Sequence, residues 1–226
     1  FQAGGLEDLV TPFDIVSLCH VLEHVPDPIR FLSSVKELLG HEGTLLIQVP
    51  NLEDNPFDLF VVDHCSHFQP RDLIDLLPCA GFRAELVATD WIDKEITFLP
   101  TPDQTKTSLE DKSLAPPRLA ALRNRLDRVQ EMASQAKAVV DKGHAGIFGT
   151  AVAAVWLDQE TECGSAFFVD EDPGRIGKIF LGREIIHPKK IPAGADILVP
   201  FRRSVAKRII SRIGHTGIAC HVLTPD

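Results

Sequence analysis

The chain has 226 residues, of which 44% are hydrophobic and 24% charged, a balance that is ordinary for a globular protein. Its formal net charge of −9 argues against nucleic acid or an anionic membrane surface as the main partner. The 5 cysteines are an odd number, and their spacing is not that of a disulfide framework, which favours a reducing compartment. We therefore expect a cytoplasmic protein. No apolar run reaches the roughly 18 residues of a membrane span. The oligomeric state is left open.

The first hundred residues alternate between strand-like and helix-like patterns. The predicted elements are strand Asp14–Leu18, helix Pro28–Leu39, strand Thr44–Val49, helix Pro70–Cys79, and strands Phe82–Ala88 and Ile96–Leu99. Gly40 to Gly43 predicts a turn, and Gly81 predicts the end of the later helix. Apolar strands separated by helices are typical of a mostly parallel sheet that is covered on both faces.

Beyond a polar, proline-containing linker the alternation restarts. The predicted elements are helix Arg118–Val140, strand Ile147–Phe148, helix Thr150–Leu157, strands Ala166–Asp170 and Ala195–Pro200, and helix Ser204–Ile213. We therefore predict an α/β fold with one domain over residues 1–100, a linker and long helix over 101–142, and a second, small doubly wound domain over 143–226.

The stretch 13–28 allows more than one interpretation. The run His20-Val-Leu-Glu-His24 spells the zinc-protease pattern H-x-x-E-H, in which one helix face presents both histidines and the glutamate is the general base. A strand precedes His20, however, and prolines two and four residues after His24 leave barely one helical turn. The pattern therefore favours a ligand loop at the carboxyl end of a parallel strand, with a merely packed strand–helix corner as the alternative.

The same stretch resembles the fourth-strand motif of class I S-adenosylmethionine-dependent methyltransferases. The resemblance implies that Cys19 and His20 lie against the methionine part of the cofactor S-adenosylmethionine, with His24 in the turn that leads to the next helix. Residues 44–51 are similar to the next strand of that fold. Residues 71–82, which end in Ala-Gly-Phe, are similar to its late helix.

Gly5 and Leu6 look like the segment that lies along the adenine in that family. The family's fold begins with a strand, a glycine-rich turn, a helix and a second strand that ends in an acid, and none of these precedes Phe1. We therefore expect an incomplete Rossmann-like methyltransferase sheet in a truncated chain, and weak or no cofactor binding by this chain alone.

The run from Asp63 to Phe68 is a second cluster of chemistry-bearing residues. Its two histidines and one cysteine suggest a metal, but no distant ligand pair completes a tetrahedral site, so we predict no metal; a structural corner is left open. The run resembles the acid-His-x-x-x-Phe segment of sugar C-methyltransferases that act on nucleotide-linked deoxysugars. The resemblance implies that His64 is the general base that removes a proton beside a ketone, with Asp63 as its partner. Those enzymes also use tyrosines around the sugar, and this chain has 0.

In the predicted domain over residues 143–226, a predicted helix is preceded by three spaced glycines, Gly143, Gly146 and Gly149. Asp170 follows about 20 residues later, as in a dinucleotide-binding fold. The spacing is not G-x-G-x-x-G, and tight helix–strand packing also explains such a cluster. The run Phe167–Gly177 resembles the C-terminal Rossmann-like domain of the same C-methyltransferase group, which implies that this domain helps to hold a nucleotide-sugar.

These patterns lead to one expected function and two alternatives. We expect an S-adenosylmethionine-dependent methyltransferase that acts on carbon of a small or nucleotide-linked, sugar-like substrate. The alternatives are a nucleotide-binding or scaffolding module without catalysis and a zinc hydrolase.

Overall fold

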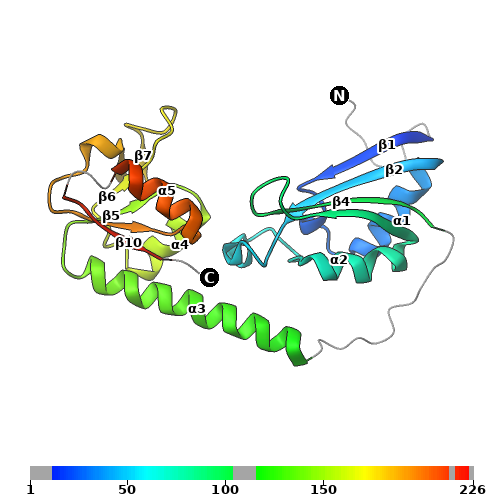
Figure 1. Ribbon diagram of the computed structural model, residues 1–226, viewed down its shortest axis with the longest axis horizontal. Helices are drawn as coiled ribbons and strands as arrows, with labels where there is room; N and C mark the ends of the chain where they lie inside the picture. Colours follow the sequence, from blue (N-terminus) through cyan, green and yellow to red (C-terminus); the bar gives the residue numbers. More distant parts are fainter. Residues whose placement is uncertain (1–11, 104–115, 214–216, 224–226) are drawn as a thin grey trace. The chain divides into compact units, whose positions relative to one another are not determined.

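The computed structural model describes residues 12–103, 116–213 and 217–223. The chain divides into two compact units, Phe1–Ala115 and Pro116–Asp226. The long helix α3 (Pro116–Val140) belongs to the second unit by this division (Figure 1). The prediction of an α/β fold is confirmed, because strands and helices make up both units.

The first unit is built on a four-stranded sheet with the order β1-β2-β4-β3. The strands are β1 (Phe13–Cys19), β2 (Leu39–Pro50), β3 (Phe82–Ala88) and β4 (Glu95–Pro102). β1 and β2 are parallel, whereas β4 is antiparallel to both β2 and β3. The prediction of a mostly parallel sheet is therefore wrong for this unit. The connection 89–94 is short, and a short connection can join only antiparallel neighbours.

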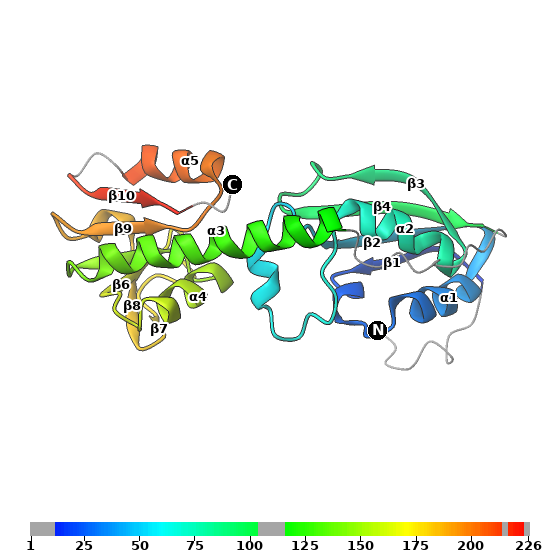
Figure 2. The same ribbon diagram turned by 90° about the horizontal axis from the view of Figure 1, so that it is seen from below.

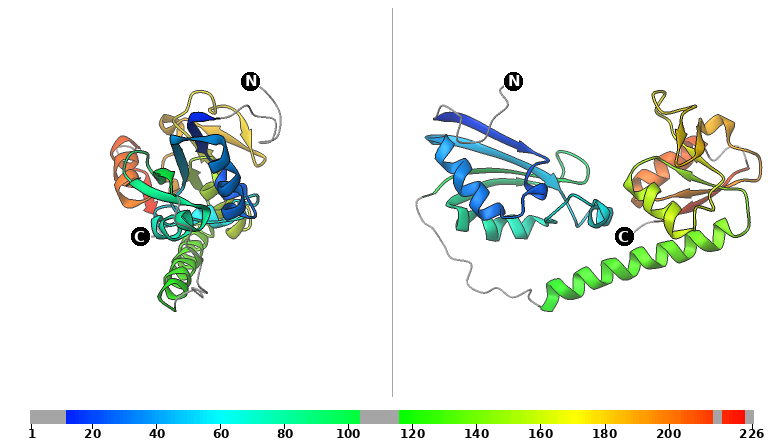
Figure 3. Two further views of the ribbon diagram at one scale, coloured as in Figure 1. Left: turned by 90° about the vertical axis from the view of Figure 1, so that its right-hand side faces the viewer. Right: turned by 180° about the vertical axis from the view of Figure 1, so that it is seen from behind.

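Two helices cover one face of this sheet. They are α1 (Pro28–Leu38) and α2 (Pro70–Leu76), the latter continued by the 3-10 turn η4 (Leu77–Ala80). The views in Figures 1 and 3 place both helices on the same side of the strands, which differs from the predicted cover on both faces. Alternate residues of β2 such as Leu45 and Ile47 are fully buried beneath them, because successive strand side chains point to opposite faces.

The predicted turn at residues 40–43 is instead part of β2. α1 ends at Leu38, and the chain is already extended at Leu39, which pairs with Phe13 of β1. Gly43 passes close to that strand, since a Cβ atom built there would lie 2.9 Å from the carbonyl oxygen of Phe13. The glycine therefore permits a close approach of two strands. From the sequence alone it was interpreted as part of a turn.

The second unit is a six-stranded sheet with the order β10-β9-β5-β6-β8-β7. Its strands are β5 (Ala145–Phe148), β6 (Phe167–Val169), β7 (Ile179–Phe180), β8 (Arg183–Ile186), β9 (Asp196–Val199) and β10 (Ala219–Val222). All neighbours are parallel except β7 and β8. The short strands β7, β8 and β10 were not expected from the sequence, because two to four residues carry little periodicity.

Helices lie on both faces of this second sheet. Figure 2 shows α5 (Arg203–Ile213) on one side of the strands, and α3 and α4 (Val152–Glu160) on the other. α5 buries Ala206, Ile209 and Ile213 against β9. On α3, Val129, Met132 and Ala136 are buried, whereas Leu119 and Leu126 near its start are exposed. No helix among the described residues is both long and apolar enough to span a bilayer.

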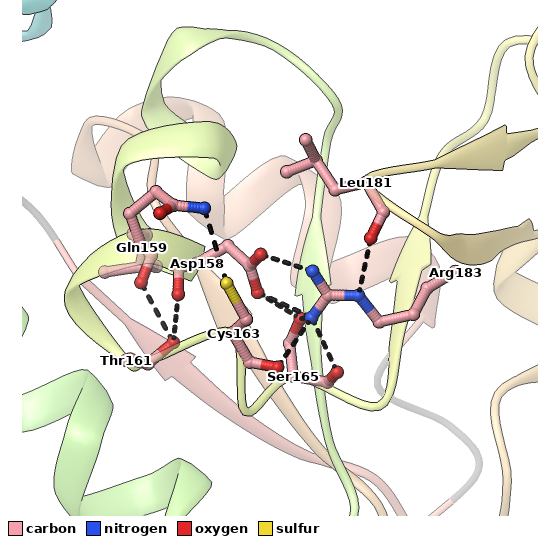
Figure 4. Close-up of polar contacts among 8 residues, drawn as sticks. Asp158, Gln159, Thr161, Cys163, Ser165, Leu181 and Arg183 are labelled. Carbon is pink, nitrogen blue, oxygen red and sulfur yellow. Dashed lines mark hydrogen bonds and ion pairs between the residues drawn. The ribbon is translucent and has the colours of Figure 1, made fainter.

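A buried ion pair lies inside the second unit (Figure 4). Asp158 on α4 is fully buried, and both of its carboxylate oxygens accept hydrogen bonds from the guanidinium of Arg183 on β8. The Ser165 hydroxyl donates a further hydrogen bond of 2.7 Å to the same carboxylate. Arg183 also lies over the ring of Phe168, 5.0 Å from its centre. The pair links α4 to β8.

Candidate functional site

Three segments of the first unit meet at one edge of its sheet. β1 and β2 are parallel, so the loops that follow them, 20–27 and 51–69, leave from the same edge. β4 runs in the opposite direction, and its first residue, Glu95, pairs with Pro50 at that edge. Figure 1 shows the loop after β2 and the hairpin between β3 and β4 at the same end of the strands. The candidate site consists of side chains from these segments.

The chain turns sharply where β1 ends. His20 has a left-handed backbone φ of 52°, and the turn η2 (Leu22–His24) is a 3-10 turn of three residues. His20 and His24 therefore do not share the face of an α-helix. The His20 ring contacts two carboxylates instead: Nδ1 lies 3.1 Å from Glu23 Oε1, and Nε2 lies 3.6 Å from Glu95 Oε2.

A buried carboxylate holds two histidines of the second loop. Asp58 lies on the 3-10 turn η3 (Pro56–Phe60), and its side chain is only 2% exposed. Its Oδ1 lies 2.7 Å from His64 Nδ1, and its Oδ2 lies 2.7 Å from His67 Nδ1. An ionised carboxylate can only accept hydrogen bonds, so these contacts favour the tautomer of each ring that has its hydrogen on Nδ1.

The predicted partner of His64 lies elsewhere. The Asp63 side chain is 76% exposed, and its carboxylate lies 3.4 Å from Nδ1 of His24. The same ring nitrogen is 3.1 Å from the Asp63 carbonyl oxygen. The carboxylate within hydrogen-bonding distance of His64 is therefore that of Asp58, six residues earlier in the chain.

The two loops are also joined to each other. The backbone N–H groups of Cys65 and Ser66 both donate to the carbonyl oxygen of Glu23, at 2.7 and 3.1 Å. The rings of His24 and His64 pack edge to face with their centres 4.8 Å apart. These contacts fix the position of His64 relative to the end of β1.

The acidic groups of the site are crowded and poorly solvated. Burial raises the pKa of the Glu95 carboxyl above its ordinary value, and the negative charges of Glu23 and Asp58 raise that pKa further, against the opposing effect of His20. Among the described residues, Oε2 of Glu23 and Oε2 of Glu95 are buried without a hydrogen bond. These oxygens could accept hydrogen bonds from a ligand.

Two groups of side chains are close enough to hold a metal ion. One consists of Glu23, His24 and His64 and the other of Asp58, His64 and His67; within each group the potential ligand atoms lie within 4.8 Å of one another. The fold thus supplies a distant ligand pair that the sequence did not reveal. In the second group both Asp58 oxygens are already bonded to imidazole nitrogens. The absence of a metal stays a prediction.

The remaining predicted cofactor residues are partly placed by the structure. Cys19 is the last residue of β1, and its thiol is free and exposed at the edge where the site lies. The side chains of His20 and His24 are also partly exposed there. Gly5 and Leu6, which were expected along the adenine, lie outside the described residues.

In the second unit, packing and backbone geometry account for the spaced glycines. A Cβ atom on Gly146 would lie 2.3 Å from the ring of Phe167 on the neighbouring strand. Gly143 and Gly149 have left-handed φ angles of 83° and 92°, which favour glycine. The carboxylate of Asp170 is engaged by protein groups, because it accepts hydrogen bonds from the Thr150 hydroxyl at 2.9 Å and from the backbone N–H of residue 172 at 3.0 Å.

Comparison with known proteins bears on the first unit. Residues 2–87 match the family model of a methyltransferase domain. No curated protein matches the chain. Among solved structures, 28 chains match, and one of them is that of the mitomycin 7-O-methyltransferase MmcR. It is 17% identical with a TM-score of 0.38, and the match covers 44% of this chain and 32% of that one.

Sequence reasoning missed two carboxylates of this site. Asp58 lies in a polar loop that also holds Asp54 and Asp63, and nothing in the sequence distinguishes the acid that becomes buried. Glu95 reaches the site because β4 is antiparallel to β2, which the prediction of a mostly parallel sheet concealed. A short β3–β4 connection read as a hairpin would have placed Glu95 correctly.

Proposed function

We propose that the protein transfers a methyl group from S-adenosylmethionine to a carbon atom of a small or nucleotide-linked, sugar-like substrate. The match of residues 2–87 to a methyltransferase domain is the observation that carries this proposal. The position of the histidine cluster supports it, because open α/β sheets bind ligands at the carboxyl ends of their parallel strands. Cys19 ends β1 at this edge and His20 follows it, and both would face the methionine part of the cofactor.

In the proposed reaction, His64 acts as the general base. Its Nδ1 carries the hydrogen that Asp58 accepts, so Nε2 has a lone pair for the substrate. Nε2 takes a proton from the carbon beside a ketone, and the electron pair of the broken C–H bond remains on the substrate as an enolate. Bound S-adenosylmethionine would supply its methyl group to that carbon and would be left as the neutral thioether S-adenosylhomocysteine.

Cofactor binding is the first test of the proposal. We expect S-adenosylhomocysteine, titrated calorimetrically, to bind the protein as its gene encodes it. Absence of binding to the gene-encoded protein would refute the methyltransferase proposal and leave the scaffolding alternative. Zinc analysis of the purified protein tests the hydrolase alternative, which requires stoichiometric metal on a group such as Glu23, His24 and His64.

The base is tested by exchange of the substrate proton. We expect the gene-encoded protein to exchange the hydrogen beside the ketone of a nucleotide-linked keto-deoxysugar with deuterated water, and His64→Gln to slow this exchange by about 10²–10⁴-fold. His41→Gln, an exposed histidine near the start of β2, is the matched control and should exchange at the wild-type rate. An unchanged rate in His64→Gln would exclude His64 as the base.

A further inference from the structure

One feature of the site is still unexplained: a single buried carboxylate is hydrogen-bonded to two imidazole rings. Asp58 is nearly inaccessible, yet both of its oxygens lie 2.7 Å from a histidine Nδ1. Burying a carboxylate is costly unless hydrogen bonds compensate it, so such a group persists where its partners are fixed. The arrangement therefore holds His64 and His67 in defined orientations.

We propose that Asp58, and not Asp63, is the positioning residue of the base His64, and that it also orients His67. This inference rests on the proposed function for its catalytic meaning. Because the carboxylate accepts from Nδ1, it selects the tautomer that leaves the Nε2 lone pair available. When Nε2 takes the substrate proton, the imidazolium lies against the negative charge of Asp58 and is stabilised by it.

Asp63 lacks the geometry for this task. Its carboxylate is largely in water and lies beside His24, so it cannot select the tautomer of the His64 ring. His67 shares the carboxylate with His64.

Nitrogen-15 NMR of the histidine rings tests the positioning role in the 226-residue chain, without cofactor or substrate. In the wild type we expect neutral His64 and His67 rings to carry the hydrogen on Nδ1. In Asp58→Asn the amide oxygen accepts one N–H while the amide nitrogen donates, so at least one ring must move its hydrogen to Nε2 or lose the bond.

Asp63→Asn is the matched control, and both rings should keep the wild-type tautomer in it. The proposal is overturned if His64 carries its hydrogen on Nε2 in the wild type, or if Asp63→Asn changes the tautomers as Asp58→Asn does. The wild-type spectrum decides the first point even if Asp58→Asn fails to fold.

The catalytic meaning is tested with the gene-encoded protein in the deuterium-exchange assay. Asp58→Asn should slow exchange by about 100-fold or more, and Asp63→Asn should change it little. Equal rates in the wild type and Asp58→Asn would overturn the positioning role. If the rings have the expected tautomers but the wild type shows neither exchange nor cofactor binding, the proposed function fails while the Asp58 geometry stands.

Discussion

At the scale of single residues, two buried carboxylates serve different purposes. Asp158 is paired with a guanidinium and a hydroxyl, so its charge is neutralised and its oxygens are satisfied. Asp58 is paired with two imidazoles, groups that can gain and lose protons near neutral pH. The first arrangement stabilises a fold, whereas the second suits proton transfer.

The Asp158–Arg183 pair predicts a large loss of stability when one partner is removed. Arg183→Met should lower the free energy of unfolding of the second unit by about 3–5 kcal/mol, because it leaves a fully buried carboxylate without its cation. Denaturant unfolding can be followed by the fluorescence of Trp156 in the second unit, in a Trp91→Phe background that removes the other tryptophan.

Arg175→Met is the control for this prediction. Its guanidinium is half exposed and pairs with Asp170 and with the half-exposed Asp172, so its loss should cost only about 0–1 kcal/mol. Equal losses of unfolding free energy in the two variants would show that burial does not determine how much the Asp158–Arg183 pair contributes to stability.

At the scale of elements, glycines were the residues whose roles the sequence left most open. Gly81 ends its helix as predicted, with a left-handed φ of 79°. Gly43 lies inside a strand instead of a turn, and Gly146 lies in β5, at a close contact with Phe167, instead of at the start of a helix. Glycine is needed at one position because the backbone has a positive φ, and at another because a side chain would collide with a neighbouring residue. The second reason depends on neighbours that are distant in sequence.

Gly146→Ala tests the packing explanation of the glycine cluster. We expect it to destabilise the second unit by about 1–3 kcal/mol, because the added methyl group collides with the ring of Phe167. Gly143→Asn should cost less than about 1 kcal/mol, since the site is open and asparagine tolerates a positive φ. Thermal unfolding of both variants measures the difference, and a fully stable Gly146→Ala would show that the Phe167 ring moves aside freely.

At the scale of the whole molecule, each unit encloses a hydrophobic core of its own. Phe98 belongs to the core of the first unit and Ile197 to a core of the second, and both are fully buried. A core that is closed within one unit makes that unit a cooperative folding unit. The effects of core substitutions should therefore stay within the unit that carries them.

Hydrogen exchange of the backbone amides tests this independence. Phe98→Ala and Ile197→Ala should each cost about 2–5 kcal/mol and should raise exchange only in the unit that carries the substitution. Loss of protection in both units after either substitution would contradict the prediction, because it would require that the two units unfold together.

The sequence by itself determined the α/β class, most strands and helices, and the methyltransferase resemblance of the stretch 13–28. These features depend on local periodicity and on short motifs, which a single chain displays directly. Only the tertiary structure decided that β4 pairs with β2 as well as with β3, and that Asp58 becomes buried. Those features depend on which distant segments come together, and the pairing of β4 with β2 and the folding of the 51–69 loop against Glu23 leave no local mark in the chain.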